Sequence, residues 1–152
     1  MNRTNSIEEN NILALERTLA LIKPDAFKAG HTGDIIKLIE SNGFRIIAMK
    51  LIRLSRRQAE GFYAVHRERP FFGPLTDFMH SGPIVAMILE REDAIKQWRE
   101  VMGATDPSKA TEGSLRKRFG TSIQNNATHG SDAPETAAFE TKYFFGELEI
   151  CP

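Results

Sequence analysis

Short apolar runs alternate with amphipathic segments along most of the chain. The runs at 17–22, 45–54 and 84–89 are rich in aliphatic and branched residues, and they predict three strands. The run at 84–89 is apolar without alternation, which is typical of a central strand that is covered on both faces. A weaker pattern at 123–128 predicts a fourth strand.

Helices are predicted between these strands. Ile35, Ile36 and Ile39 recur at helical spacing, and Gly43 suits the position just beyond a helix end. Ser55 and Asp93 are residue types that favour helix N-caps. The predicted helices span about 34–42, 55–65, 72–79, 93–102, 114–119 and 132–144, the last beginning with Asp132 and Glu135 as a capping box.

The order of these elements predicts an α+β fold. It matches a ferredoxin-like βαββαβ sandwich, an antiparallel four-stranded sheet covered by helices, which we expect to pack on one face. Residues 1–16 are polar and lack clear periodicity, so we expect an N-terminal extension there and one folded domain over 17–152. The first residues lack an apolar signal-peptide core and no apolar run could span a bilayer, so a cytoplasmic location is expected.

Composition and charge exclude several classes of protein. The 152 residues are enough to bury a core without help from a disulfide or a metal. The single cysteine, Cys151, excludes an internal disulfide and a Cys-rich zinc site. Lys plus Arg and Asp plus Glu both number 20, so the net charge does not attract nucleic acid or anionic lipid. An anion site would need a local basic concentration, and 96–118 holds six basic residues against three acidic ones.

His129 stands out among the histidines because of its neighbours. It is followed by Gly130, which leaves room for a ligand, and it precedes a predicted helix N-terminus, which favours neutral imidazole and attracts anions. A neutral imidazole can act as a nucleophile if an acceptor holds its other nitrogen, and Glu140 could fold back to do so. The alternative is a turn histidine before a capped helix. The isolated histidines are expected to be structural or solvated: His31, His66 and His80.

Two familiar kinds of active site are disfavoured by the sequence. Ser131 and Asp132 lie next to His129, but near neighbours in one turn rarely form a serine triad, and no G-x-S-x-G motif is present. There is also no Walker motif and no kinase glycine-rich loop. Any bound phosphate would therefore depend on side chains, for which the planar fork of arginine is well suited.

Several segments, taken together, resemble the nucleoside diphosphate kinase family. They occur in the order and at the spacing of that family, from about residue 17 to the C-terminus, and residues 1–16 lie outside the resemblance. The most specific is the N-x-x-H-G-S-D motif. The segments are Leu21-Ile22-Lys23-Pro24-Asp25, Arg69-Pro70-Phe71-Phe72, His80-Ser81-Gly82-Pro83 and Asn126-Ala127-Thr128-His129-Gly130-Ser131-Asp132.

The resemblance implies a set of catalytic residues. His129 corresponds to the histidine that is phosphorylated through Nδ1, and Glu140 to the carboxylate that holds the other ring nitrogen. Ser131 is expected to hydrogen-bond nearby. Lys23 and Tyr63 correspond to residues that stabilise the transferring phosphoryl group.

The resemblance also implies how the nucleotide is bound. Arg99, Thr105 and Arg116 correspond to phosphate ligands, Asn126 and Lys23 to contacts with the sugar hydroxyls. Phe71 corresponds to the aromatic residue that stacks on the base, with an apolar residue, here Ile123, on its other face. The implied cofactor is Mg²⁺, held mainly by the nucleotide phosphates and not by a protein metal site. Judged without the family, the same residues would be core aromatics, turn residues and a surface arginine.

The implied activity is transfer of the terminal phosphate of a nucleoside triphosphate, such as ATP or GTP, to a nucleoside diphosphate. It would run by a ping-pong mechanism through phospho-His129, with little base specificity because stacking does not read base identity. The implied assembly is a homo-oligomer, a tetramer or a hexamer, with no membrane and no specific nucleic acid as partner.

Two other functions fit parts of the sequence. One is a ferredoxin-like binding module for nucleic acid or protein, although the zero net charge and the lack of an RNP1-like aromatic run disfavour nucleic acid. The other is a regulatory phosphohistidine carrier, which would keep His129 but would not need Phe71 or Asn126. The chain also departs from the family at His31, usually apolar there, and at Arg118, often acidic.

Overall fold

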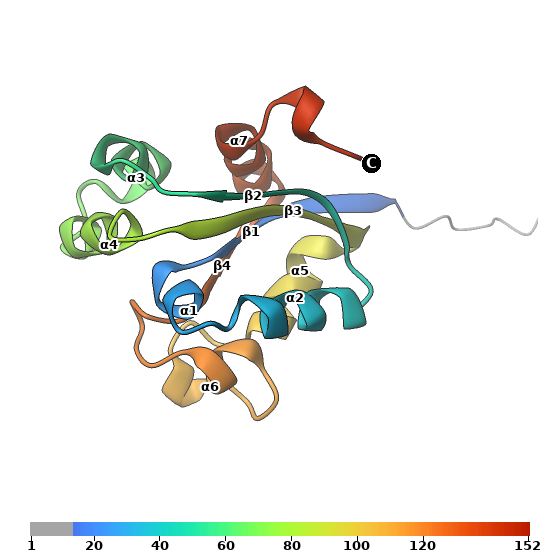
Figure 1. The fold of residues 1–152 in the computed structure, drawn as a ribbon, viewed down its shortest axis with the longest axis horizontal. Helices are drawn as coiled ribbons and strands as arrows, with labels where there is room; N and C mark the ends of the chain where they lie inside the picture. The colour runs from blue at the N-terminus through green and yellow to red at the C-terminus, as the bar shows by residue number, and fades with distance from the viewer. Residues whose placement is uncertain (1–13) are drawn as a thin grey trace, which may run out of the picture.

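Four antiparallel strands form the sheet in this computed structural model, which describes residues 14–152. The strand order is β2-β3-β1-β4, so β1 and β3 are central and β2 and β4 are edges (Figure 1). The predicted α+β class and antiparallel four-stranded sheet are confirmed. The strands are β1 (Leu15–Ile22), β2 (Arg45–Ile52), β3 (Ile84–Glu92) and β4 (Thr128–Gly130).

The helices connect these strands and cover the sheet. Two of the connections include a short 3-10 turn, and a third such turn follows the last helix. The α-helices are α1 (Pro24–Lys28), α2 (Thr32–Ser41), α3 (Arg56–Phe62), α4 (Phe72–Met79), α5 (Ala94–Met102), α6 (Leu115–Phe119) and α7 (Pro134–Phe144). The 3-10 turns are η1 (Ala64–His66), η2 (Pro107–Lys109) and η3 (Glu147–Glu149).

The helices lie on both faces of the sheet, so the prediction that they pack on one face is wrong. Figure 1 shows α2, α5 and α6 below the sheet and α3 and α7 above it, with α4 next to α3 at one end of the sheet. Alternate residues of β1 accordingly enter two cores. Leu19 and Leu21 pack with residues of α3 and α7, while Ala20 and Ile22 pack with residues of α2 and α5. A second helical layer is needed because the central strands are apolar on both sides.

Strand boundaries differ from the sequence prediction at several points. β1 begins at Leu15, two residues earlier than predicted, and of the expected N-terminal extension residues 1–13 lie outside the described residues. β3 continues to Glu92 because Glu90, although buried, pairs with Arg17 at 2.9 Å and Arg45 at 3.5 Å on the flanking strands. The fourth strand was predicted at 123–128, but it lies at 128–130. It forms by backbone pairing with β1 and has no apolar pattern of its own.

Helix ends follow the sequence in part. Ser55 caps α3 in a capping box with Gln58, as the sequence predicts for its N-cap, and Gly43 follows α2 with a φ of +81°. Asp93 precedes α5 but makes no capping hydrogen bond, because its backbone is left-handed. The Glu16 carboxylate accepts from the Ile95 amide at 2.8 Å instead.

The predicted capping box at the start of α7 is also wrong. The helix starts at Pro134, so neither Asp132 nor Glu135 holds the position that the box requires. The Thr136 hydroxyl instead accepts hydrogen bonds from the amides of Asp132 and Ala133, at 3.1 and 3.0 Å. The N-terminus of α7 is therefore capped by Thr136, a residue of its own first turn.

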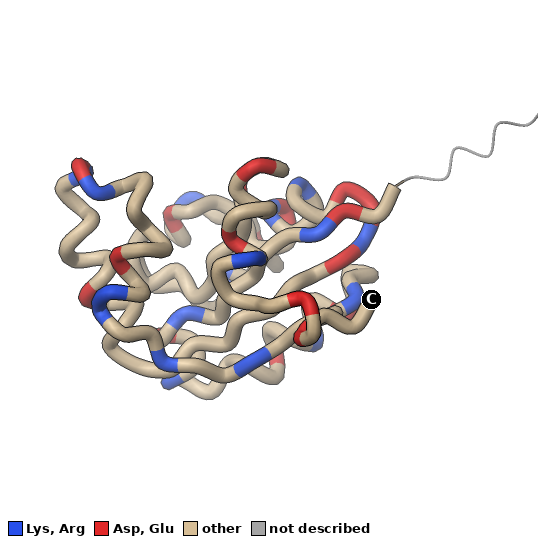
Figure 2. Tube along the Cα trace, turned by 90° about the horizontal axis from the view of Figure 1, so that it is seen from above, with Lys and Arg blue, Asp and Glu red and all other residues tan. Residues whose placement is uncertain are grey.

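Acidic and basic residues are both distributed along the trace, as the colours in Figure 2 show. This distribution agrees with the zero net charge of the sequence. None of the helices within residues 14–152 combines the length and the apolar character needed to cross a membrane.

Candidate active site

One deep cleft lies between the sheet end and the loops that follow β1, α5 and α6. Its volume is about 1180 Å³. Residues far apart in the sequence meet on its wall, and every residue that the sequence analysis related to nucleotide binding is among them. These are Lys23, Tyr63, Phe71, Arg99, Thr105, Arg116 and Asn126, together with His129 and Ile123.

His129 lies in the middle of β4, opposite Leu21 of β1. Its Nε2 is 2.8 Å from Oε1 of Glu140, and 19% of its side chain is exposed. Its Nδ1 has no hydrogen-bond partner within residues 14–152. The carboxylate thus favours the tautomer with a proton on Nε2, which leaves the Nδ1 lone pair available for reaction.

Ser131 hydrogen-bonds to Glu140 and not to His129. Its hydroxyl donates to the same Glu140 oxygen at 2.8 Å and accepts from the Leu19 amide at 3.2 Å. Ser131 is fully buried. This arrangement is not a serine triad, because the hydroxyl is directed at the acid and not at the imidazole.

Aromatic rings border the imidazole. Phe62 and Tyr63 meet the His129 ring edge to face, with centroids 5.3 and 6.2 Å away. Burial, with a smaller contribution from the Glu140 charge, raises the pKa of the Tyr63 hydroxyl well above its usual value. Tyr63 therefore remains a neutral hydroxyl throughout the physiological range.

Lys23 lies just after β1 and is almost fully buried. Its ammonium donates to the carbonyl of Gln124 and to Oδ1 of Asn126, both at 2.9 Å. An ammonium has three N–H donors, so one remains for a ligand. Burial lowers the pKa of Lys23 to about 8, with Asp25 opposing and Arg116 adding to that shift.

Arg116 is fixed by two main-chain carbonyls. Its guanidinium donates to Gly103 at 3.1 Å and to Thr128 at 3.0 Å, while its buried Nε has no partner among the described residues. Burial lowers its pKa to about 10, and the charge of Arg99 in the same cleft contributes. Positive groups that repel one another and are held together by the fold create a site for a polyanion.

Phe71 and Ile123 form the outer part of the cleft. Their exposed fractions are 49% and 63%, so both present apolar surface to solvent. His66 also lines the cleft, with its ring 5.3 Å from that of Phe71 and 6.4 Å from that of Tyr63. Sequence reasoning missed His66, and the only signal available was its position between two aromatic residues of the site.

The backbone just before His129 is held in an unusual conformation. Ala127 has a φ of +73°, which residues other than glycine, asparagine and aspartate seldom adopt. Its amide donates to the Asp25 carboxylate at 3.1 Å, and its carbonyl accepts from the Lys23 amide at 2.8 Å. The Lys-Pro-Asp segment thus fixes the strand that carries His129.

The two departures from the family pattern meet at one ring. The imidazole of His31 lies 4.5 Å from the ring of Phe119, and the guanidinium of Arg118 lies 4.7 Å from it. Neither residue lines the cleft. The departures therefore change the outer surface of α6 and leave the site intact.

Comparison with known proteins gives a consistent result. The family model for nucleoside diphosphate kinase matches residues 16–150. The nucleoside diphosphate kinase of Syntrophotalea carbinolica is 60% identical over 136 residues, which is 90% of this chain and 99% of that protein. That of Oleidesulfovibrio alaskensis is 58% identical over 135 residues, covering 89% of this chain and 97% of that protein.

Solved structures agree with these sequence matches. A crystal form of the Aquifex aeolicus nucleoside diphosphate kinase superposes with a TM-score of 0.88 at 48% identity, covering 90% of this chain and 99% of that one. A halophilic nucleoside diphosphate kinase from Halobacterium salinarum, solved in complex with CDP, also gives 0.88. It is 36% identical and covers 91% of this chain and 93% of that one.

Proposed function

The chain belongs to the nucleoside diphosphate kinase family, and we propose that His129 is its nucleophile. The enzyme transfers the terminal phosphate of a nucleoside triphosphate to a nucleoside diphosphate in two half-reactions, with phosphohistidine between them. The observation that carries the proposal is the 2.8 Å contact of Nε2 with Glu140, on a histidine that shares its cleft with Lys23, Arg99 and Arg116.

Each residue at the reacting end has a role that its contacts support. Glu140 orients the imidazole and stabilises positive charge on it as Nδ1 attacks phosphorus, and Ser131 orients Glu140. Lys23 and Tyr63 donate to the oxygens of the transferring group. Their charge and hydroxyl are placed before the reaction, which is the main contribution a protein makes to phosphoryl transfer.

The remaining cleft residues bind the nucleotide. Arg99, Thr105 and Arg116 hold the phosphates, a role that their shared position on the cleft wall supports. Asn126 and Lys23 contact the sugar hydroxyls, and Phe71 stacks on the base. His66 lies beside Phe71 in the same cleft, and we expect it to contact the nucleotide there. A phosphohistidine carrier for proteins would need none of these aromatic and amide groups.

Mg²⁺ accompanies the nucleotide in this proposal. The cleft offers the Asp132 carboxylate, an oxygen ligand of the kind Mg²⁺ takes, and no cluster of three acidic, His or Cys residues suited to a metal occurs within residues 14–152. That donor set fits an ion held mainly by phosphate oxygens. When bound, Mg²⁺ supplies positive charge to the β- and γ-phosphates.

The proposed setting is a homo-oligomer, a tetramer or a hexamer, in the cytoplasm. Met49 and Leu51 on the edge strand β2 are more than half exposed, which supports burial against another copy. The substrates are nucleoside di- and triphosphates of any base.

Incubation with ATP and Mg²⁺ but no acceptor should leave about one phosphate per chain on His129. The first half-reaction stops there because no diphosphate arrives, and the imidazole phosphoramidate should be acid-labile and alkali-stable. Mass spectrometry and radiolabelling measure the stoichiometry. Discharge by any nucleoside diphosphate is expected, whereas an acid-stable label on Ser131, or transfer only to protein, would refute the proposal.

Phe71→Ala should weaken the binding of all nucleotides by similar factors, on the order of 1–3 kcal/mol, because stacking surface is lost without loss of a base-specific hydrogen bond. Calorimetric titration with ADP, GDP, CDP and TDP measures this. Val65→Ala removes an 83% exposed apolar side chain that does not line the cleft, and it should change nothing. A loss confined to one base would mean that Phe71 reads base identity.

A further inference from the structure

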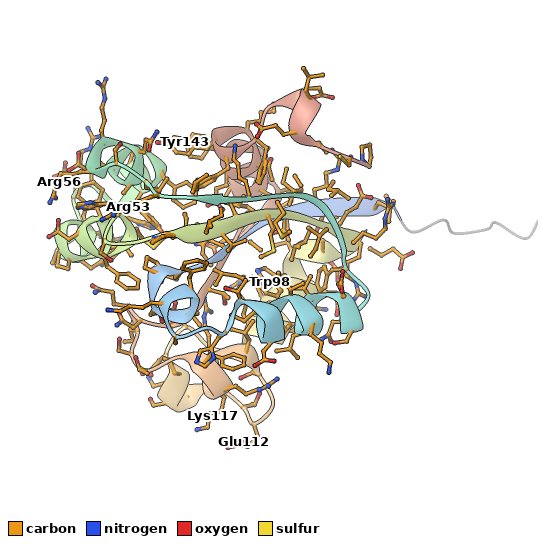
Figure 3. All side chains as sticks on the ribbon, in the orientation of Figure 1. Arg53, Arg56, Trp98, Glu112, Lys117 and Tyr143 are labelled. Carbon is orange, nitrogen blue, oxygen red and sulfur yellow. The ribbon has the colours of Figure 1, made fainter. Side chains whose placement is uncertain are left out.

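Trp98 connects α5 to the main chain of His129. The indole Nε1 donates to the His129 carbonyl at 3.2 Å, and the side chain is fully buried. Phe44 meets the indole edge to face, with centroids 6.0 Å apart. Figure 3 shows Trp98 beneath the sheet, on the side of α2 and α5.

Gly130 provides the space for this contact. A Cβ at Gly130 would come within 2.5 Å of the indole Cδ1 and 2.6 Å of the Met102 methyl group. Because successive residues of a strand face opposite sides, Gly130 faces Trp98 while the His129 side chain faces Phe62 and Glu140. Two contacts thus hold β4. The imidazole of His129 bonds to Glu140 on one face of the sheet, and the carbonyl of His129 accepts from Trp98, which lies on the other.

The same helix carries a phosphate ligand of the proposed site. Arg99 follows Trp98 in α5 and is exposed to the cleft, while Trp98 is directed into the core. A buried indole N–H usually finds a partner, but here the acceptor belongs to the reacting histidine. This hydrogen bond therefore links the helix that carries Arg99 directly to the backbone of His129.

We propose that Trp98 is a positioning residue for phosphoryl transfer, acting through the main chain of His129 and not through contact with the nucleotide. This inference rests on the proposed role of His129. Its loss should slow the attack on phosphorus, because a histidine free to shift by a fraction of an ångström spends less time in the reactive geometry. It should leave nucleotide affinity nearly unchanged.

The sharpest test replaces only the donor. Since Trp98 is the single tryptophan of the chain, 3-benzothienylalanine incorporated at this position exchanges the N–H for sulfur and keeps the shape. At saturating ATP, the single-turnover rate of His129 phosphorylation should fall about fivefold to tenfold, the effect of one buried hydrogen bond. The Kd for ATP should stay within about twofold, and the final label should remain near one phosphate per chain.

Phe44→Leu is the matched control. It removes the aromatic neighbour of Trp98 but leaves the indole donor in place, so it should lower the melting temperature without a comparable change in the phosphorylation rate. If the benzothienyl protein reacts at the wild-type rate, Trp98 is only a core residue and the inference is wrong. Failure of the wild-type protein to form phosphohistidine would instead refute the proposed function.

A second measurement covers the case in which the substituted protein does not fold. The single indole ¹H–¹⁵N resonance of the unmodified protein should shift when ATP phosphorylates His129. In His129→Ala, which can bind ATP without being phosphorylated, the same addition should produce a smaller shift. Equal shifts in the two proteins would show that the indole does not respond to the nucleophile, and would overturn the inference.

Discussion

Replacing His129 with alanine should reduce nucleotide exchange by about 10⁴-fold or more and should abolish the acid-labile label. The reason is that this substitution removes the proposed nucleophile, and we expect the cleft residues that remain to bind a nucleotide without accepting its phosphate. Two measurements check this: the rate of NTP formation in a coupled assay, and the phosphate bound per chain after incubation with ATP and Mg²⁺.

Two further variants calibrate that result. His80→Ala changes a histidine outside the cleft, near Asp77, and should keep both activity and label. Glu140→Ala should slow transfer without abolishing it, because Nδ1 remains while the group that orients the ring is lost. Label that persists in His129→Ala would require a different nucleophile and would overturn the mechanism.

The second large effect concerns Lys23, whose pKa is about 8 in the free protein. Its ammonium is charged below that pH and becomes neutral above it, so kcat/KM for ATP should decline as the pH rises through about 8. Lys23→Met, which keeps the alkyl volume, should lower kcat by roughly 10²–10³-fold, as expected for the loss of one preorganised donor to developing charge. Steady-state kinetics between pH 6 and 10 measure both effects.

The neighbouring ionisable groups of the cleft do not titrate in the same pH range as Lys23. Arg116 stays charged over the range in which Lys23 titrates, because burial lowers its pKa only to about 10, and the Tyr63 hydroxyl stays protonated. Lys23→Arg should remove the decline near pH 8, because arginine remains charged, although the larger fork should fit poorly and give a lower rate. A wild-type profile that is flat from pH 7 to 9 would contradict this role.

Elements with a strong apolar pattern could be predicted from the sequence. Elements that depend on contacts with distant parts of the chain could not. The runs of β1 and β3 and the amphipathic face of α2 are local properties, so their positions were correct within a few residues. β4 has only three residues and no apolar alternation, and it exists because it pairs with β1. The caps of α5 and α7 likewise come from Glu16 and Thr136, which local cap rules do not consider.

In the candidate site, too, some contacts follow from local sequence and others depend on the fold. His129 and Glu140 are close in sequence, so their contact could be anticipated from spacing, and the motif resemblance supplied the rest of the residue set. The convergence of Lys23 with Arg116, and its hydrogen bonds to the 124–126 segment, depend on how the strands are ordered in the sheet. The role of Trp98 depends on a glycine on a different element, and no periodicity in either segment indicates it.

The burial of Trp98 has an optical consequence. A lone indole that is buried away from water should emit at shorter wavelength than an exposed one, and all tryptophan fluorescence of the chain comes from this one position beside His129. The emission of each chain therefore reports the environment of its own His129, with no dye attached. Both half-reactions could be followed in a stopped-flow instrument by light from the unmodified protein.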